Sequence, residues 1–534
     1  MNSSRLRVLV ADSLASEDLA PLREMGVEVV EQPTISAADL ERVIPDYDGL
    51  LVRSRTQVTR QLLGMGPRLK VVGRAGTGVD NVDVAAATEK GILVMNVPGG
   101  NAVAAAEHTL AVLFALARQI PRANQSLREG HWDRKTFVGF ELTGKTIGVL
   151  GLGKIGQEVA SRAVGLKMRV LAYDPQLSSE AIEDKGLIAA DLATLFAESD
   201  VITVHVPLLP STTHLLDARA FAQMKRGVTI LNVARGGIVH EGDLLTALHS
   251  GQVGSAGLDV FEVEPPQCTE LLAHPRVVAT PHLGASTTEA QSGVSRAIAD
   301  QVCTYFRDGS IVNAVNLPGS GSMQPEALPW KRLARRLGGL ASGLKKGGIR
   351  GLELTVVGEG VPCDETGLLR EALVGLLAPF SDHVVNVVNA EGEGRARGFS
   401  FSVLKRAKHP AFQAMLRVKL EDEGEGLVLD GTLFGNNNLR IVRAYGCNMD
   451  AIPEGPMLWV CQEDVPGIIA HISAVLSDVQ INIDNMSVGR TDSGNLAMAV
   501  LNLRESPTEV ALRAIADHPS VKWVKLLSKR VLST

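Results

Sequence analysis

The sequence predicts an α/β protein with two Rossmann-like or flavodoxin-like parallel-sheet domains and a cleft between them. An α+β domain and a C-terminal ferredoxin-like domain are expected to follow. Three observations predict this fold class. Apolar strands alternate with helical segments from the start of the chain, which is typical of parallel sheets covered on both faces. The alternation restarts near 145 with a strand and a glycine-rich turn. The segment after 456 reads as βαββαβ, the ferredoxin-like order.

The totals limit the classes of function. A chain of 534 residues is too long for one hydrophobic core, so three or four domains are expected. The net charge of −6 gives no support to nucleic-acid binding. The N-terminal segment lacks the apolar run of a signal peptide. The most apolar helical run contains Glu107 and His108, so we expect no membrane span and a cytoplasmic location.

Cysteine usage agrees with that location. The cysteines are scattered along the chain and include no CxxC pair. This pattern favours reduced thiols and predicts no metal site. The cysteines are Cys268, Cys303, Cys363, Cys447 and Cys461.

The first α/β unit is expected to contain short apolar strands joined by helices. After a strand in RVLVAD, a helix in EDLAPLREMG ends at a glycine, and Ser36 suits the N-cap of a helix in SAADLERVI. Further strands are predicted in VEVVEQ, GLLVRS, LKVVGRAG and ILVMNV. One long helix is expected from about Asn101 to Gly130.

The second α/β unit begins with the strand and turn in KTIGVLGLGKIG. Its later strands are predicted in RVLAYDP, DVITVHVP, VTILNVAR, GSAGLDV and RVVATPH. A helix in TTEAQSGVSRAIADQVCTYFRDG then returns the chain toward the first unit. Gly, Ser and Pro concentrate at 316–330, as in a linker. Residues 330–450 have mixed α/β character and carry no motif that indicates a chemistry.

The stretch GLGKIG predicts a dinucleotide site. A lone GxGxxG pattern is weak, but this one follows a strand directly and opens a helix. Gly151 permits the tight turn, Gly153 lets a pyrophosphate approach the backbone, and Gly156 lets helix and strand pack closely. The free N–H groups of the helix N-terminus favour phosphate. Asp174 ends the next strand, where a carboxylate accepts from ribose hydroxyls and repels a 2′-phosphate, so NAD is favoured over NADP.

Three further stretches end strands of the same unit and predict a reacting site. They contain Arg235, then Asp259 with Glu262 and Glu264, then His282. Ligands of such sheets bind beyond the carboxyl ends of the strands, so these side chains are expected to converge. A histidine suits removal of a hydroxyl proton, a carboxylate holds its ring, and an arginine binds a substrate carboxylate. The alternative is that these are ordinary loop residues.

The stretches GLGKIGQEVA, NVARGGIVHEGDLLTAL, AGLDVFEVEPP and TPHLGAST resemble the D-isomer-specific 2-hydroxyacid dehydrogenase family over about residues 5–316. The resemblance implies an NAD-dependent enzyme in which Arg235 binds the substrate carboxylate and carbonyl. It implies that His282 is the proton acceptor, with Glu264 as its partner, and that Asp259 lies beside the nicotinamide. The cofactor residues that it implies are Gly151, Gly153, Lys154, Ile155, Gly156, Asp174, Val233, Ala234, Arg235, Asp259, His282, Gly284 and Thr77.

Within that family, LLVRSRTQVT and LKVVGRAGTGVDNVDVAAATEKGILVMNVPGGN are similar to the phosphoglycerate dehydrogenases. This implies oxidation of 3-phospho-D-glycerate to 3-phosphooxypyruvate, the first step of L-serine biosynthesis, with 2-oxoglutarate reduction as a side activity. Such a substrate needs several cations, and Arg53 and Arg55 are expected on one side of a strand end. A solvated surface charge is the alternative for each cation. The expected substrate residues are Arg53, Ser54, Arg55, Arg74, Gly76, Asn101, Arg235 and, from a neighbouring subunit, Trp132, Arg134 and Lys135.

Residues 317–534 resemble the long form of these enzymes, with an intervening domain and an ACT domain. The resemblance implies a homotetramer that includes a dimer through the nucleotide domain. It also implies an L-serine effector site at Gln462, Asp464 and Asn482. A purely structural tail and, for the whole chain, an NAD(H)-sensing corepressor-like protein are the alternatives. The expected domains are 1–97 with 287–316 for substrate, 98–286 for NAD, 317–452 as the intervening domain and 453–534 as the ACT domain.

Overall fold

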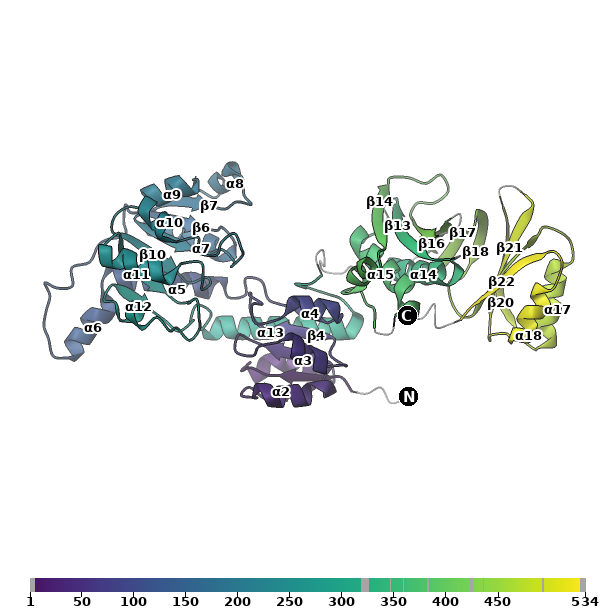
Figure 1. Cartoon of the computed structure of the whole chain (residues 1–534), viewed down its shortest axis with the longest axis horizontal. Coiled ribbons are helices and arrows are strands. Elements are labelled where there is room, and N and C mark those ends of the chain that lie inside the picture. Colours follow the sequence, from purple (N-terminus) through teal and green to yellow (C-terminus); the bar gives the residue numbers. More distant parts are fainter. Residues whose placement is uncertain are drawn as a thin grey trace.

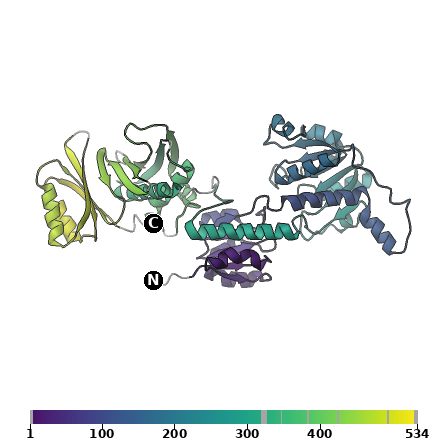
Figure 2. The same ribbon diagram turned by 180° about the vertical axis from the view of Figure 1, so that it is seen from behind.

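The computed structural model describes residues 5–528 apart from 318–325, 346, 359, 382–383, 423–425, 436 and 492–493. The described strands form four sheets. Figure 1 shows the sheets in a row along the long axis, with the second sheet at one end, the first in the middle, and the third and fourth at the other end. Figure 2 shows the same order from behind. The predicted fold class is confirmed.

The first sheet is parallel throughout, and its strands are β1 (Arg7–Val10), β2 (Glu28–Glu31), β3 (Gly49–Val52), β4 (Val71–Arg74) and β5 (Leu93–Met95). Their order, β2-β1-β3-β4-β5, is flavodoxin-like. The predicted N-cap at Ser36 is confirmed, because its side chain accepts from the amide of Asp39. The helical segments are η1 (Ser16–Leu19), α1 (Ala20–Glu24), α2 (Ala37–Val43), η2 (Ile44–Asp46), α3 (Arg60–Met65) and α4 (Val84–Glu89).

Helix α13 (Thr288–Asp308) packs on this first sheet although it follows the last strand of the second one. Val294, Ile298 and Val302 on its buried face belong to the core cluster of β1, β3 and β4. The side chain of Thr287 caps the helix N-terminus, and Gly309 ends the helix in the left-handed region at φ 76°. The chain therefore returns to the first unit, as the sequence predicts.

The second sheet is also parallel, and its strands are β6 (Thr146–Leu150), β7 (Arg169–Tyr173), β8 (Ile188–Ala189), β9 (Val201–Val204), β10 (Val228–Asn232), β11 (Val253–Leu258) and β12 (Val277–Ala279). In the order β12-β11-β10-β9-β6-β7-β8 the winding reverses between β6 and β9. Dinucleotides bind at such a reversal in doubly wound sheets. Helices of this unit include α7 (Lys154–Gly165), α8 (Ser179–Glu183), α9 (Leu192–Glu198), α10 (Ala218–Gln223), α11 (Glu241–Ser250) and α12 (Thr269–Ala273).

The single long helix expected from 101 to 130 is wrong. The structure has two helices, α5 (Ala102–Ala117) and α6 (Ile120–Arg128), bent by 60°. The break follows from Gln119, which is left-handed at φ 50°, and from Pro121, which supplies no amide to continue the hydrogen-bond ladder. Taken together as a bent pair they pass a length-and-composition test for a membrane span, but no single helix among the described residues passes it.

The third sheet has the strand order β14 (Ser400–Arg406), β13 (Ile349–Val357), β15 (Met415–Asp422), β16 (Leu427–Phe434), β17 (Asn438–Ala444) and β18 (Cys447–Ala451). Only the β13–β14 pair is parallel in this sheet as described. Helix α14 (Ala327–Leu344) and helix α15 (Glu365–Leu377) share its apolar core, which explains the mixed character of this stretch. The segments η3 (Ala378–Phe380) and α16 (Ala390–Ala396) follow.

The fourth sheet confirms the predicted βαββαβ unit. Its elements in chain order are β19 (Met457–Glu463), α17 (Ile468–Asp478), β20 (Ile483–Arg490), β21 (Leu496–Leu503), α18 (Glu509–Ala516) and β22 (Val521–Leu527). The strands pair antiparallel in the order β20-β21-β19-β22. The third and fourth sheets are in contact. At this contact the amide of Asp450 on β18 donates to Oγ of Ser487 on β20 at 2.9 Å.

Candidate active site

The glycine-rich turn lies between β6 and α7, at the point where the second sheet reverses its winding. Gly151 has φ 91°, so the turn needs a glycine there. A Cβ on Gly156 would lie 1.9 Å from the carbonyl oxygen of Gly151, so only glycine allows this approach of helix and strand. A Cβ on Gly153 would meet no protein atom within 4 Å. The space over Gly153 therefore suits a pyrophosphate, as the motif predicts.

Asp174 follows β7, beside this turn. Its Oδ2 accepts from the amide of Leu152 at 2.8 Å and its Oδ1 from the amide of Gln176 at 2.9 Å. These bonds fix the carboxylate next to the turn, and its remaining lone pairs are available to ribose hydroxyls. The Nζ of Lys154 donates to the carbonyl oxygen of Pro98 at 2.8 Å, so this side chain is directed to the connection between the two α/β units.

His205 packs against the inner side of the same turn. Its ring is buried, and Nε2 is 2.9 Å from Oγ1 of Thr203. Burial lowers the pKa of His205 to about 4, so the imidazole is neutral at physiological pH. A Cβ on Gly151 would lie 2.7 Å from the carbonyl oxygen of His205. The turn is therefore packed tightly on its inner side and open on its outer side.

His282 and Glu264 form a hydrogen-bonded pair at the carboxyl ends of the strands. Nδ1 of His282 lies 2.8 Å from Oε2 of Glu264, and the two side chains are 46% and 39% exposed. An ionised carboxylate only accepts, so Nδ1 carries the proton and Nε2 keeps a lone pair. Oε1 of Glu264 accepts from the amide of Phe261 at 3.3 Å. The pair lines a hollow of about 510 Å³.

The carboxylate of Asp259 organises the loop of His282. Oδ1 accepts from Oγ1 of Thr280 at 2.6 Å and from the amide of Leu283 at 2.7 Å. Oδ2 accepts from the amide of Gly284 at 2.8 Å. Burial alone would raise the pKa of Asp259, but these bonds and His108 outweigh it and leave the pKa lowered. A direct contact of Asp259 with the cofactor stays a prediction.

Arg235 reaches from the second α/β unit to the first. Its Nε donates to Oδ2 of Asp80 at 2.8 Å, and a Cβ on Gly78 would lie 2.0 Å from its Nη2. Arg74 is close by: burial and then the Arg235 guanidinium lower the pKa of Arg74 to about 10. Arg53 acts on it in the same direction. An anion bound here would relieve this repulsion among guanidinium groups.

Arg53 and Arg55 lie at a strand end as expected, because β3 ends at Val52, but in a loop and not on extended strand backbone. Asp12 pulls the chain into a loop: its Oδ2 accepts from the amide of Arg53 at 2.6 Å and its Oδ1 from Nε of Arg55 at 3.0 Å. The Arg55 side chain is thus occupied by Asp12. Ser54 lies exposed between them.

Other predicted residues line the connection between the units. Oγ1 of Thr77 donates to Oδ1 of Asn101 at 2.8 Å, and the amide of Gly99 donates to Oγ1 of Thr77 at 3.2 Å. The positive φ of Gly76, 149°, places the backbone beside the Arg74 guanidinium. Val233 packs against the backbone of Gly284. Ala234 lies beside it and is buried, and Ile155 is in the first turn of α7.

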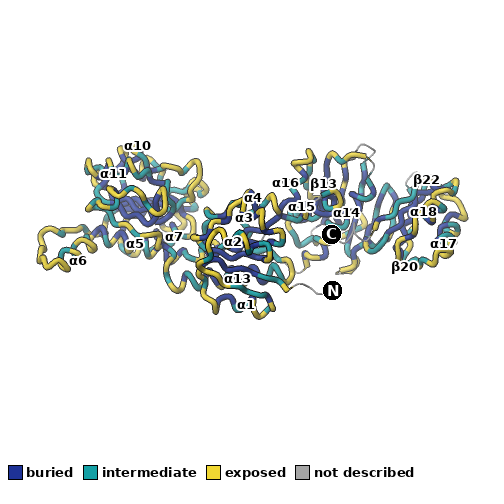
Figure 3. The backbone as a smooth tube through the Cα atoms, turned by 60° about the horizontal axis from the view of Figure 1, so that its bottom comes forward, coloured by how far each residue is buried: buried dark blue, intermediate teal, exposed yellow. Residues whose placement is uncertain are grey.

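Trp132, Arg134 and Lys135 lie on an arm that follows α6. Figure 1 places α6 at the end of the second unit that is remote from the first sheet, and Figure 3 shows α6 as mostly exposed. The Trp132 side chain is 78% exposed. Within one chain the structure therefore does not bring these three residues to Arg235 and His282.

The three effector candidates lie at the fourth sheet. Gln462 is on β19 and is 3% exposed, and its Oε1 has no hydrogen-bond partner among the described residues. Oδ2 of Asp464 lies 2.7 Å from Nε of Arg490. Asn482 is exposed and directly precedes β20.

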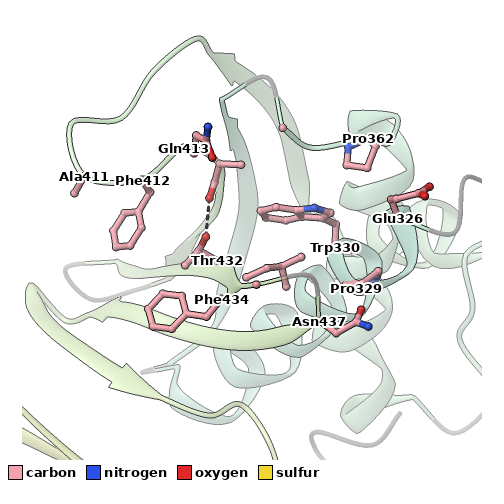
Figure 4. Close-up of a pocket in the computed structure, with 14 residues that line it drawn as sticks. Glu326, Pro329, Trp330, Pro362, Ala411, Phe412, Gln413, Thr432, Phe434 and Asn437 are labelled. Atoms are coloured by element: carbon pink, nitrogen blue, oxygen red, sulfur yellow. Dashed lines mark hydrogen bonds between the residues drawn. The ribbon is translucent and has the colours of Figure 1, made fainter.

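A separate cavity of about 640 Å³ lies in the third-sheet unit. Figure 4 shows the Trp330 ring at its wall, with Phe412 and Phe434 across from it and the buried Thr432 between them. Its lining mixes aromatic rings with the polar side chains of Glu326, Gln413, Thr432 and Asn437. No motif in the sequence pointed to it.

Two contacts of the candidate site were not predicted from the sequence. Asp80 holds Arg235, and Nε2 of His108 lies 3.3 Å from Oδ1 of Asp259. Each partner comes from a distant part of the chain, so no local spacing links them. The only signal was a histidine in the middle of the apolar run of α5, which is unusual without a buried partner.

Comparisons with known proteins agree with this geometry. The NAD binding domain model of D-isomer specific 2-hydroxyacid dehydrogenases matches 110–284, the D-3-phosphoglycerate dehydrogenase intervening domain model matches 326–444, and the ACT domain model matches 460–519. A D-3-phosphoglycerate dehydrogenase of Archaeoglobus fulgidus is 40% identical over 514 residues, covering 95% of this chain and 97% of the relative. Another, of Bacillus subtilis, is 37% identical over 523 residues, covering 98% and 99%.

One similar solved structure is a D-lactate dehydrogenase of Aquifex aeolicus complexed with NAD and lactic acid. It is 26% identical, with a TM-score of 0.50, and the match covers 57% of this chain and 96% of that one.

Gly153 and Gly156 provide a matched test of the nucleotide turn. Gly156→Ala should lower the thermal unfolding midpoint, because its Cβ would overlap the backbone of Gly151. Gly153→Ala should keep the midpoint but weaken NADH binding by about tenfold or more, because its methyl group fills the space for phosphate. Thermal unfolding and a fluorescence titration with NADH measure both effects. Unchanged NADH affinity in Gly153→Ala would contradict this assignment.

Proposed function

The chain belongs to the D-3-phosphoglycerate dehydrogenase family, and from this premise we propose that it oxidises 3-phospho-D-glycerate at C2 to 3-phosphooxypyruvate. The observation that carries the proposal is the 2.8 Å pairing of His282 with Glu264. Both residues and Arg235 follow the carboxyl ends of neighbouring strands of the second sheet. The turn from Gly151 to Gly156 and Asp174 fit the adenosine and pyrophosphate parts of NAD. When bound, NAD supplies the nicotinamide that accepts the hydride.

Each residue of the set has a separate task. Arg235 binds the substrate carboxylate with two parallel hydrogen bonds and polarises C2–O. Nε2 of His282 takes the proton of the C2 hydroxyl, since Nδ1 already carries a proton. Glu264 keeps the ring oriented and stabilises it once it is doubly protonated. Asp80 holds Arg235 in place until a substrate arrives.

The phosphate group needs further cations. We assign Arg74 and Arg53 to it, because the charges of Arg235 and Arg53 both lower the pKa of Arg74, which lies near each of them. Arg55 is the weaker candidate, since Asp12 occupies its guanidinium. Trp132, Arg134 and Lys135 would contribute only from a neighbouring subunit.

The proposed domains are 1–97 with 287–316 for substrate, 98–286 for NAD, 317–452 as the intervening domain and 453–534 as the ACT domain. Rotation about hinges near 98 and 286 would close the cleft and exclude water. We infer a dimer through the nucleotide domain, because α6 is exposed at the surface of that unit. We propose a homotetramer and a cytoplasmic location from the resemblance to the long-form enzymes. The corepressor-like alternative is not favoured, because the full-length relatives are dehydrogenases.

Initial rates with 3-phospho-D-glycerate and NAD test the function. The wild-type protein should reduce NAD, and His282→Ala should lower kcat by about 10²–10⁴, the range for a lost general base. His249→Asn is the matched control, because it removes a half-exposed histidine of the same domain that pairs with Glu270. A parallel assay with 2-oxoglutarate and NADH measures the side activity.

Two outcomes would reject these roles. No turnover of 3-phospho-D-glycerate while NADH still binds would reject the substrate, and a wild-type kcat in His282→Ala across pH would reject the base.

We further propose that the ACT domain binds L-serine as an effector. Asp464 offers a carboxylate to its ammonium group, and Asn482 of a paired domain offers an amide. The buried Oε1 of Gln462, without a partner among the described residues, is a further acceptor.

A titration of activity against serine tests this effector site. Serine should inhibit the wild-type enzyme, and Asp464→Ala should remove the inhibition while turnover stays intact, because the carboxylate that holds the ammonium group is gone. The mass in solution, measured alongside, reports the oligomer. If Asp464→Ala is inhibited like wild type, the site lies elsewhere.

A further inference from the structure

Three side chains outside the catalytic set meet beside it: His214, His240 and Glu262. One ligand atom of each lies within 4.8 Å of the other two. The rings of His214 and His240 meet edge to face with centroids 4.6 Å apart, and Nε2 of His214 is 3.6 Å from Oε1 of Glu262. Among the described residues no other group of His, Cys, Asp or Glu meets this criterion.

The topology explains why residues so far apart in sequence converge. They lie in the segments that follow β9, β10 and β11, which are neighbours in the second sheet. The amide of His214 donates to the carbonyl oxygen of Gly237 at 2.7 Å, which ties the first segment to the second. A Cβ on Gly236 would lie 1.7 Å from the carbonyl oxygen of Phe261, so the second and third segments are also in close backbone contact.

Hydrogen bonds hold two of the three side chains in place. Nδ1 of His240 accepts from the amide of Asp243 at 3.3 Å, which caps α11, and lies 3.0 Å from Oδ2 of the same residue. With Nδ1 engaged at the helix N-terminus, Nε2 is the ring nitrogen left to bind an ion, and binding would release its proton. Oε1 of Glu262 accepts from the amide of Glu241 at 2.9 Å, which fixes the carboxylate and leaves it further acceptor capacity.

We propose that His214, His240 and Glu262 bind a divalent transition-metal ion such as Zn²⁺. Two imidazoles and one carboxylate are an established zinc ligand set, with a fourth position open to water. Bonds of about 2.0–2.2 Å in a tetrahedral site place ligand atoms roughly 3.4 Å apart. The 3.6 Å separation of His214 and Glu262 is already close to this value. The three side chains are 34% to 44% exposed, so they can rotate. Rotation would bring the remaining ligand atoms to this separation.

The ion would act on loops of the proposed active site. Glu262 precedes Glu264 by two residues, and the segment of Gly236 begins next to Arg235. A bound ion would therefore cross-link the loops that carry both residues and stabilise the folded state by mass action. This inference goes beyond the dehydrogenase activity and does not depend on it.

The chain offers a matched control at His249. Its Nε2 is 3.4 Å from Oε1 of Glu270, and its ring is 5.3 Å from that of His274. Nδ1 of His274 instead accepts from the amide of Arg276 at 3.2 Å. The residue types match those of the proposed site, but no third ligand atom joins them.

Calorimetric titration of the tag-free, chelator-treated full chain with ZnCl₂ tests the site. One ion should bind per chain, and His214→Asn, His240→Asn and Glu262→Gln should each weaken binding at least about tenfold. His249→Asn should bind as wild type does. The replacements are conservative, because Asn tolerates the φ of 52° at His214 and caps α11 in place of His240. Gln keeps an acceptor for the amide of Glu241.

Thermal unfolding separates binding from folding. Zn²⁺ should raise the unfolding midpoint of the wild type and of His249→Asn, and not that of Glu262→Gln. Equal Zn²⁺ affinity in the wild type and in both His214→Asn and Glu262→Gln would overturn the proposal. So would loss of the ion in His282→Ala but not in His214→Asn, because the ion would then lie on the catalytic pair.

Discussion

The buried carboxylate of Asp259 is the interaction on which the active-site geometry depends. It is 1% exposed, yet it stays ionised because a hydroxyl, two backbone amides and His108 surround it. These bonds fix the backbone on both sides of His282, which is itself in the left-handed region at φ 56°. The amide of His282 donates to the carbonyl oxygen of Asp259 at 2.9 Å. One residue thus sets the position from which the ring reaches Glu264.

A second constraint is electrostatic. Burial lowers the pKa of Arg74, and the nearby charges of Arg235 and Arg53 lower it further. Asp80 compensates part of this charge through its 2.8 Å bond to Arg235. A substrate that carries a carboxylate and a phosphate matches such a site, because it replaces a single compensating carboxylate by two anionic groups. The bond between Arg235 and Asp80 also joins the two α/β units. A substrate that replaces this bond would therefore change the contact between the two units.

The sequence predicted what local patterns determine. The glycine turn was predictable because the steric reasons for Gly151 and Gly156 lie within a few residues of each other. The ACT-type unit was predictable because its order of strands and helices is characteristic. The break at Gln119 and Pro121 was missed because apolar periodicity continues across it. The loop at Arg53 was missed because Asp12, far away in sequence, bends the chain there. For the same reason the sequence did not predict the contacts of Asp80 and His108. It also did not predict the group of His214, His240 and Glu262, because these residues are distant in sequence and only the fold brings them together.

The most direct test of this account is the kcat of Asp259→Asn with 3-phospho-D-glycerate at saturating NAD. Asn has the same shape, but its NH₂ group would face amide or hydroxyl donors where a carboxylate oxygen now accepts. We expect kcat to fall by about 10²-fold, the lower end of the range for a lost general base, while the KM for NAD stays near wild type. The thermal midpoint should fall as well, because a buried donor is left without an acceptor, so kcat is measured well below that midpoint. A wild-type kcat would contradict the claim that Asp259 positions His282.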